Sequence, residues 1–90
     1  MTDDGGWRVE FAPRARRDLK RLDPPIQRRI LAAIERLLDD PPTGDRRKLT
    51  GHGDEWRLRV GDWRVRFTRR PDQQLIIIQR LLPRGRAYRD

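Results

Sequence analysis

Cysteine is absent from the 90 residues of this chain, and histidine occurs once, as His52. The fold therefore cannot depend on disulfides, on cysteine-ligated zinc or on a thiol nucleophile. Secreted scaffolds of this size usually need such cross-links, so their absence favours an intracellular protein. One histidine, and carboxylates that are not clustered in the basic half, leave no metal site. No metal and no other cofactor is expected.

Long apolar segments are missing as well. No stretch approaches the roughly 20 apolar residues that span a bilayer. Residues 1–6 are acidic and glycine-rich, which excludes a signal peptide there, and we expect them to be disordered. The length allows one domain, residues 1–90. We therefore expect a single-domain cytoplasmic protein without a membrane partner.

Charge is abundant and unevenly distributed, with a formal net charge of +8. Residues 1–45 hold nine basic and nine acidic side chains, whereas residues 46–90 hold thirteen basic and five acidic ones. The whole excess thus lies in the C-terminal half. Twenty of the 22 basic residues are arginine, which suits bidentate binding of phosphate and stacking on bases. This pattern points first to polyanions and second to acidic protein partners.

The N-terminal half predicts one strand and two helices. Residues 7–11 alternate apolar and polar side chains, which is the period of a half-buried strand. Pro13 can begin a helix, in which apolar residues follow at helical spacing to Leu22. Asp23, as a cap before two prolines, begins a second amphipathic helix that runs to about Leu38. Two helices with almost no linker form a helical hairpin.

The C-terminal half predicts a small sheet. Residues 39–45 are expected to be a loop and residues 48–53 a turn or irregular chain, because of their Pro and Gly content. Strands are predicted at 55–60 and 63–68, joined by a two-residue turn. A last strand at 75–82, apolar on both faces, favours a central place in the sheet. The chain is thus predicted to be α+β, ordered β-α-α-β-β-β, with the helical hairpin on one face of a mainly antiparallel sheet.

The hairpin across Gly61-Asp62 carries the functional prediction. A two-residue loop there places the apolar side chains of both strands on one face and four arginines on the other, Arg57, Arg59, Arg64 and Arg66. No acid interrupts this set. Like charges directly opposed across a ladder cost a few tenths to about 1 kcal/mol per pair, and a row of bound phosphates would compensate that cost. The alternative is an ordinary solvated face, although such faces usually mix both signs.

The C-terminal tail adds Arg84 and Tyr88. A tyrosine near an arginine cluster is suited to stacking on an unpaired base, which favours RNA as the polyanion. The alternative for Tyr88 is a ring that anchors the C-terminus to the core.

Several motifs in this order resemble the RelE branch of the RelE/ParE toxin superfamily, the toxins of type II toxin–antitoxin pairs. The resemblance extends from about Trp7 to Arg89, and its most specific part is the hairpin. It rests on Leu19, Leu22, Pro41-Pro42, Lys48-Leu49-x-Gly51, Trp56-Arg57-Leu58-Arg59-x-Gly61-Asp62-Trp63-Arg64-Val65 and Arg84-x-x-x-Tyr88.

RelE toxins are endoribonucleases that enter the A site of the ribosome and cut mRNA. The resemblance implies the same α+β fold, mRNA and the 70S ribosome as partners, and a cognate antitoxin. It implies that Arg64 and Arg84 hold the scissile phosphate while the 2′-hydroxyl attacks it, and that Tyr88 orients a base. The implied catalytic residues are Arg59, Arg64, Arg84 and Tyr88. Further RNA contacts are expected from Lys48, Arg57, Arg66 and Arg86.

One departure concerns the proton acceptor. Active relatives often have lysine at the positions of Arg57 and Arg59, and a lysine of lowered pKa can act as a general base. Arginine stays protonated and is a poor base. Asp62 is expected to serve the turn and His52 to be solvated, and Pro83 stands where many relatives have a polar residue. The sequence therefore supports phosphate binding better than proton transfer.

Two alternatives belong to other classes. The ParE branch of the superfamily inhibits DNA gyrase and lacks the nuclease residues. A basic RNA-binding module without activity is the other, and no helix-turn-helix or zinc signature supports specific binding of duplex DNA.

Overall fold

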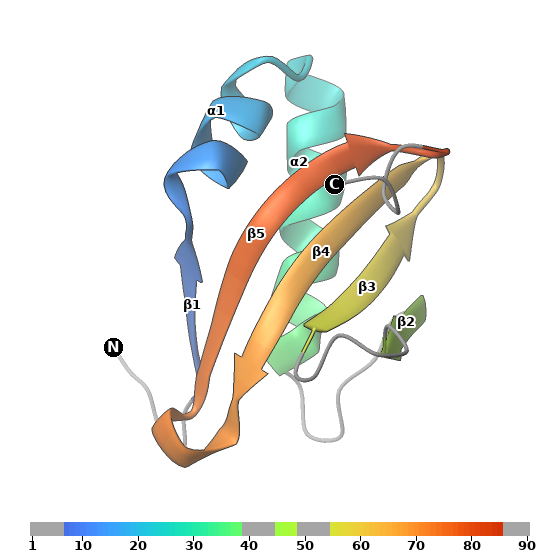
Figure 1. Ribbon diagram of the computed structural model, residues 1–90. Coiled ribbons are helices and arrows are strands. Elements are labelled where there is room, and N and C mark those ends of the chain that lie inside the picture. Colours follow the sequence, from blue (N-terminus) through green and yellow to red (C-terminus); the bar gives the residue numbers. More distant parts are fainter. Residues whose placement is uncertain (1–6, 39–44, 49–54, 86–90) are drawn as a thin grey trace.

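The computed structural model of the protein describes residues 7–38, 45–48 and 55–85 (Figure 1). No helix in these ranges is both long enough and apolar enough to cross a membrane. The elements in chain order are β1 (Arg8–Phe11), α1 (Pro13–Lys20), α2 (Pro24–Glu35), the 3₁₀ turn η1 (Arg36–Leu38), β2 (Asp45–Lys48), β3 (Glu55–Val60), β4 (Trp63–Arg70), the 3₁₀ turn η2 (Pro71–Gln73) and β5 (Leu75–Pro83).

Both predicted helices begin at proline. Pro13 is the first residue of α1, and Pro24 and Pro25 open α2, because the fixed φ of proline suits the first helical turn, where N–H groups lack partners. Asp23 occupies the N-cap position of α2 with an extended backbone, but its side chain makes no capping hydrogen bond. Pro25, at the second helical position, has no N–H for a cap to accept.

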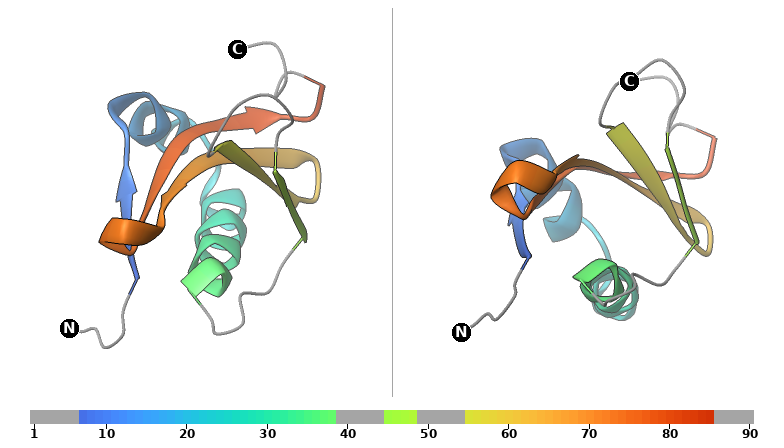
Figure 2. Two further views of the ribbon diagram at one scale, coloured as in Figure 1. Left: turned by 60° about the horizontal axis from the view of Figure 1, so that its bottom comes forward. Right: turned by 90° about the horizontal axis from the view of Figure 1, so that it is seen from below.

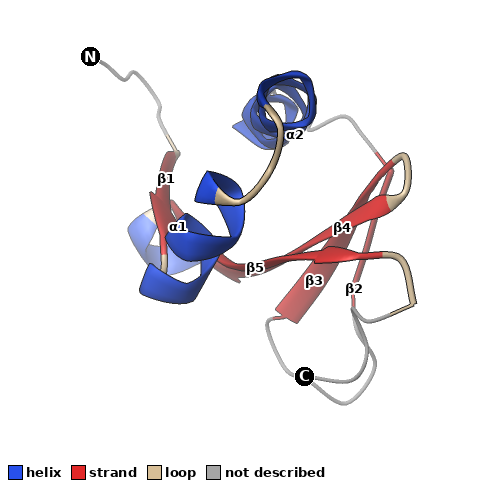
Figure 3. Ribbon diagram, turned by 90° about the horizontal axis from the view of Figure 1, so that it is seen from above, coloured by secondary structure: helices blue, strands red, loops and turns tan. Residues whose placement is uncertain are grey.

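The strands form one five-stranded sheet in the order β1-β5-β4-β3-β2. Among the described strands, β1 and β5 are the one parallel pair, and the other neighbours are antiparallel. The predicted α+β class is confirmed, and β5 has a strand on each side, as its apolar sequence indicates. Figure 3 shows α2 across one face of the sheet and α1 beside β1 and β5. In the views of Figure 2, no described helix covers the opposite face of β3 and β4.

The strand β2 corrects the predicted element order, in which the segment between the second helix and the hairpin had no strand. Asp45 was expected in a loop, and no strand was predicted between α2 and the hairpin. Instead, Asp45–Lys48 pairs antiparallel with β3, from Asp45 opposite Arg59 to Lys48 opposite Trp56. The segment Asp-Arg-Arg-Lys has no apolar alternation, so its sequence carries no strand signal. Backbone pairing with β3 makes it the edge strand of the sheet. Residues 39–44 and 49–54 lie outside the described ranges.

The core lies between α2 and the sheet. Ile30 and Ile34 of α2 belong to one buried cluster with the inward side chains of the strands, which include Leu58, Val65 and Phe67. Trp56 stacks on Phe67 with 6.4 Å between ring centroids. Trp56, Val60 and Trp63 pack against the same cluster. The apolar face predicted for the hairpin is therefore the face that contacts the core.

The helix α1 closes the edge of β5 where β1 ends. The strand β1 pairs only with Leu75 to Ile78 of β5, and the next bond runs from the N–H of Ala12 to the Ile78 carbonyl, at 2.9 Å. Beyond that point the Asp18 carboxylate accepts the N–H of Leu81 at 2.9 Å. The same carboxylate accepts the Arg80 guanidinium, with 2.9 Å between Nε and Oδ2. These contacts hold the C-terminal part of β5, from which the chain continues to Arg84.

Candidate nucleic-acid interface

The β3–β4 hairpin has the predicted register. Arg57 lies opposite Arg66 and Arg59 opposite Arg64 across the Gly61-Asp62 turn. Gly61 has φ +59° and Asp62 is not in the positive-φ region, which is the arrangement of a type II′ turn, with glycine first. Residues directly opposite in a ladder share a face, so the four arginines lie on the face opposite the core. We refer to this surface as the arginine face.

Arg64 is held at the hairpin turn by its own side chain. Its Nη1 donates hydrogen bonds to the carbonyl oxygens of Gly61 and Trp63, each at 2.9 Å. The side chain makes no other hydrogen bond within the described part of the chain, so Nε and Nη2 remain for a ligand. A guanidinium fixed in this way loses less freedom when it binds an anion.

Arg84 reaches the same turn from the far end of β5. The β4–β5 ladder ends with Arg64 opposite Leu82 and Trp63 opposite Pro83. The N–H of Arg84 then donates to the Asp62 carbonyl at 2.7 Å, which continues the pairing by one step. The Arg84 side chain is exposed. Tertiary structure therefore brings the Arg64 side chain and the Arg84 backbone to one turn.

Glu55 places an acid on the arginine face. Its Oε1 lies 2.8 Å from Arg66 Nη2, and Arg66 is only 9% exposed. No acid lies among the four arginines in the ladder, as predicted, but Glu55 begins the same strand, shares their face and reaches Arg66 from the position opposite Thr68. Arg80, opposite Arg66 on β5, is likewise paired with Asp18. Among the described residues, Arg64 at the hairpin turn enters no such ion pair.

The other predicted residues are placed as follows. Arg57 is half-buried and Arg59 is exposed on β3. Lys48 ends β2 with its backbone opposite Trp56. Asp62 is exposed in the turn, where its carbonyl holds Arg84. Arg86 and Tyr88, and also His52, lie outside the described residues.

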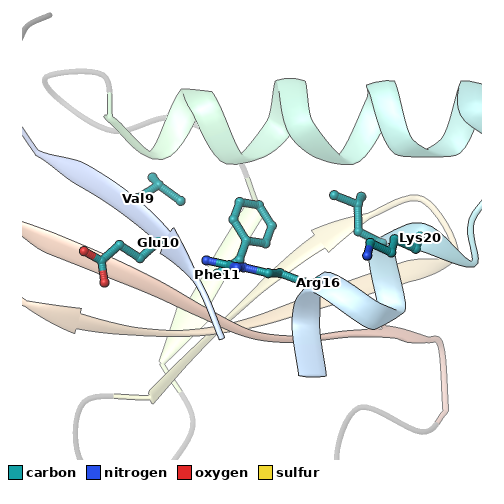
Figure 4. Close-up of a pocket in the computed structure, with 6 residues that line it drawn as sticks. Val9, Glu10, Phe11, Arg16 and Lys20 are labelled. Atoms are coloured by element: carbon teal, nitrogen blue, oxygen red, sulfur yellow. The ribbon is translucent and has the colours of Figure 1, made fainter. Parts of the chain in front are cut away.

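The sequence predicted none of the hollows beside the sheet, of which two bear on the site. One, of about 670 Å³, lies between β1 and α1 (Figure 4) and is lined by Val9, Glu10, Phe11, Arg16, Leu19 and Lys20. Its charges are mixed, and β5 and β4 separate β1 from β3, so it is not part of the arginine face. The other, of about 410 Å³, lies between α2 and β3 and has Arg29, Arg36 and Arg59 among its lining residues.

Comparison with known proteins agrees with this fold. The family described as ParE toxin of the type II toxin–antitoxin system parDE matches residues 9–88. A protein of Methanocaldococcus jannaschii that carries the name toxin RelE1 is 30% identical over 87 residues, which are 93% of this chain and 97% of that protein.

Two solved structures are also similar. The archaeal RelE–RelB complex of Pyrococcus horikoshii includes a chain that is 34% identical, with a TM-score of 0.76, over 90% of this chain and 98% of that one. The RelB–RelE antitoxin–toxin complex of Methanococcus jannaschii includes a chain that is 28% identical, with a TM-score of 0.72, over 90% of this chain and 96% of that one. The protein belongs to the RelE branch of the RelE/ParE superfamily of type II toxins.

Proposed function

We propose that the protein is a ribosome-dependent endoribonuclease that cuts mRNA in the A site. The observation that carries this proposal is the convergence of Arg64 and Arg84 on the Gly61-Asp62 turn. The Arg64 guanidinium is held at this turn, and the backbone N–H of Arg84 is bound to the Asp62 carbonyl there. Arg59 lies opposite Arg64. Guanidinium groups bind phosphate oxygens in a bidentate manner, so this end of the arginine face suits one phosphate of an RNA strand.

The chemistry supplied by these residues is charge stabilisation. In the proposed reaction the 2′-oxygen forms a bond to phosphorus and the bond from phosphorus to the 5′-oxygen breaks. The products are a 2′,3′-cyclic phosphate and a 5′-hydroxyl, and the proton that the 2′-hydroxyl releases to water is balanced by the one that the leaving 5′-oxygen takes up. Negative charge grows on the phosphate oxygens during this step, and preorganised arginines stabilise it more strongly than water does. Arginine stays protonated, so Arg59, Arg64 and Arg84 act by holding the phosphate rather than by accepting the proton.

The remaining RNA contacts are assigned by position and by family resemblance. Arg57 lies on the arginine face next to Arg59, and we assign Lys48 and Arg86 to the flanking RNA backbone. Tyr88 is assigned to stacking on a base. Arg66 contributes less than the sequence predicted, because its Nη2 is engaged by Glu55.

A cognate antitoxin is the proposed protein partner. The similar chains of Pyrococcus horikoshii and Methanococcus jannaschii were solved as complexes of RelE with RelB. A protein of net charge +8 attracts an acidic segment electrostatically, and such a segment on the arginine face would exclude RNA.

Cleavage in cells tests the proposal directly. Induced expression followed by primer extension on cellular mRNA should reveal discrete cuts within translated frames. Arg64→Ala and Arg84→Ala should each abolish the cuts, because either change removes a guanidinium from the phosphate. Arg70→Ala is the matched control, since it removes an exposed arginine at the other end of β4 and should leave cleavage intact. Cleavage by a folded Arg64→Ala, Arg84→Ala double variant at the wild-type level would refute the proposed site.

A ParE-like inhibitor of DNA gyrase is the second candidate. It is favoured by the ParE description of the matched family and by arginine at the positions where active RelE toxins often have lysine. Intact mRNA together with DNA breaks and an SOS response would identify this activity. Normal growth with neither sign would leave a basic RNA-binding module.

A further inference from the structure

A third arginine, from the helix α2, reaches the hairpin turn. A Cβ atom placed on Gly61 would lie 2.9 Å from Nη2 and 3.8 Å from Cζ of Arg29. The Arg29 guanidinium therefore packs directly against the Gly61 backbone. Sequence gave no indication of this contact, because Arg29 and Gly61 are separated by three elements and lie in different layers of the fold.

Three arginines thus meet at one two-residue turn, Arg29 and Arg64 through their guanidinium groups and Arg84 through its backbone N–H. Arg29 comes from α2, Arg64 from β4 and Arg84 from the end of β5. Arg29 is exposed and enters no ion pair within the described part of the chain. Like charges gathered in this way repel one another, and a bound anion is the natural compensation.

The positive surface continues past the turn toward α2. Arg29, Arg36 and Arg59 line the groove of about 410 Å³ between α2 and β3. Arg59 also belongs to the arginine face through its pairing with Arg64. The groove and the arginine face therefore meet at Arg59, which gives an extended polyanion a continuous path around the hairpin end.

We propose that Arg29 is a further RNA-binding residue, which contacts a phosphate next to the one held by Arg64 and Arg84. The ligand is the phosphodiester backbone of single-stranded RNA, so the contact is independent of base sequence. This inference rests on the proposed function, in which Arg64 and Arg84 hold the scissile phosphate. It extends the site from the sheet to α2.

The salt dependence of binding tests the assignment. The probe is a labelled 2′-O-methyl oligonucleotide, which cannot be cut because its 2′-oxygens are blocked. Its dissociation constant is measured by fluorescence anisotropy over a series of KCl concentrations. Arg29→Ala should reduce the magnitude of the slope of the logarithm of the association constant against the logarithm of salt concentration by about 0.7. This is the contribution of one phosphate contact on a single strand. Arg29→Lys keeps the charge and should keep most of the slope.

Arg28→Ala is the matched control. It removes the same charge from the neighbouring exposed position of α2, but Arg28 neither lines the groove nor lies near Gly61. Its slope should equal that of the wild type. Equal slopes for Arg29→Ala and Arg28→Ala, both folded by circular dichroism, would overturn the assignment of Arg29.

The two proposals fail in different ways. If Arg64→Ala and Arg84→Ala weaken binding and Arg29→Ala does not, the RNA site is confined to the sheet and only the further inference is wrong. If none of the three weakens binding, the arginine cluster at the turn does not bind RNA, and the proposed function fails with it. Loss of antitoxin binding alone in Arg29→Ala would assign the groove to a protein partner and also overturn the inference.

Discussion

Arg64 and Arg66 lie two residues apart on β4 and point to the same face, yet their surroundings differ. Arg64 is tied to two carbonyl oxygens at the turn through Nη1 alone. Arg66 is 9% exposed and its Nη2 lies 2.8 Å from Glu55 Oε1. A buried cation needs a compensating charge, so Arg66 serves stability, whereas Arg64 has donors left for a ligand. Identical residues on one strand thus have separate roles.

Removing the charge of Glu55 tests the structural role of Arg66. Glu55→Gln should lower the free energy of unfolding by about 1–2 kcal/mol, because the buried Arg66 loses the carboxylate that compensates it. Urea denaturation followed by circular dichroism measures the change. Glu35→Gln, at an exposed position of α2, is the control and should stay within about 0.5 kcal/mol of the wild type. An unchanged midpoint for Glu55→Gln would contradict the structural role of Arg66.

At the scale of elements, α1 takes the place that a pairing strand would have along the edge of β5, beyond the point where β1 ends. The strand β1 is only four residues long, so the N–H of Leu81 lies beyond its reach. The Asp18 carboxylate accepts that N–H and binds Arg80, with side-chain exposures of 12% for Asp18 and 18% for Arg80. One side chain thus closes a sheet edge and neutralises a cation next to the arginine face. The contact also anchors the segment of β5 that leads to Arg84.

The contact between Asp18 and β5 should be among the most costly to remove. Asp18→Ala removes the carboxylate that accepts hydrogen bonds from the Arg80 guanidinium and the Leu81 N–H, and we expect a loss of about 3 kcal/mol in the free energy of unfolding. Asp23→Ala is the control in the same helical hairpin. The Asp23 side chain makes no capping hydrogen bond, so its removal should cost less than about 0.5 kcal/mol. Equal costs for the two variants in chemical denaturation would disprove this account.

At the scale of the whole molecule, the charge asymmetry of the sequence becomes an asymmetry of faces. The helices come from the half of the chain in which nine basic and nine acidic residues cancel. The arginine face comes from the other half, on the side of the sheet that α2 does not cover (Figure 2). A surface of one sign raises the rate of encounter with an oppositely charged polymer and makes binding sensitive to salt.

Binding of RNA should therefore weaken steeply as salt rises. Seven basic residues are assigned to phosphates of the RNA backbone, namely Arg29, Arg57, Arg59, Arg64 and Arg84 together with the flanking Lys48 and Arg86. With about 0.7 per contact on a single strand, the expected slope of the logarithm of the association constant against the logarithm of salt concentration is about −5. Anisotropy with the 2′-O-methyl probe gives the value, and a DNA strand of equal length should give a similar one. A slope near zero would exclude binding through the phosphates.

The sequence by itself determined the hairpin, its register and the face on which the arginines lie. Alternation along a strand and a two-residue turn are local properties, so neighbouring residues suffice to predict them. The proline residues at which both helices begin, and the central place of β5, were predictable for the same reason, and the family resemblance followed from motifs in chain order.

Only tertiary structure decided the rest, namely the pairing of β2 with β3, the bond of Asp18 to β5, and the approach of Arg29 to Gly61. These contacts join residues far apart in the chain, and their energy depends on burial and distance that no local pattern records. The ion pair between Glu55 and Arg66 depended on both. The alternation along β3 places Glu55 on the same face as the arginines, but only the folded structure shows that its carboxylate reaches Arg66.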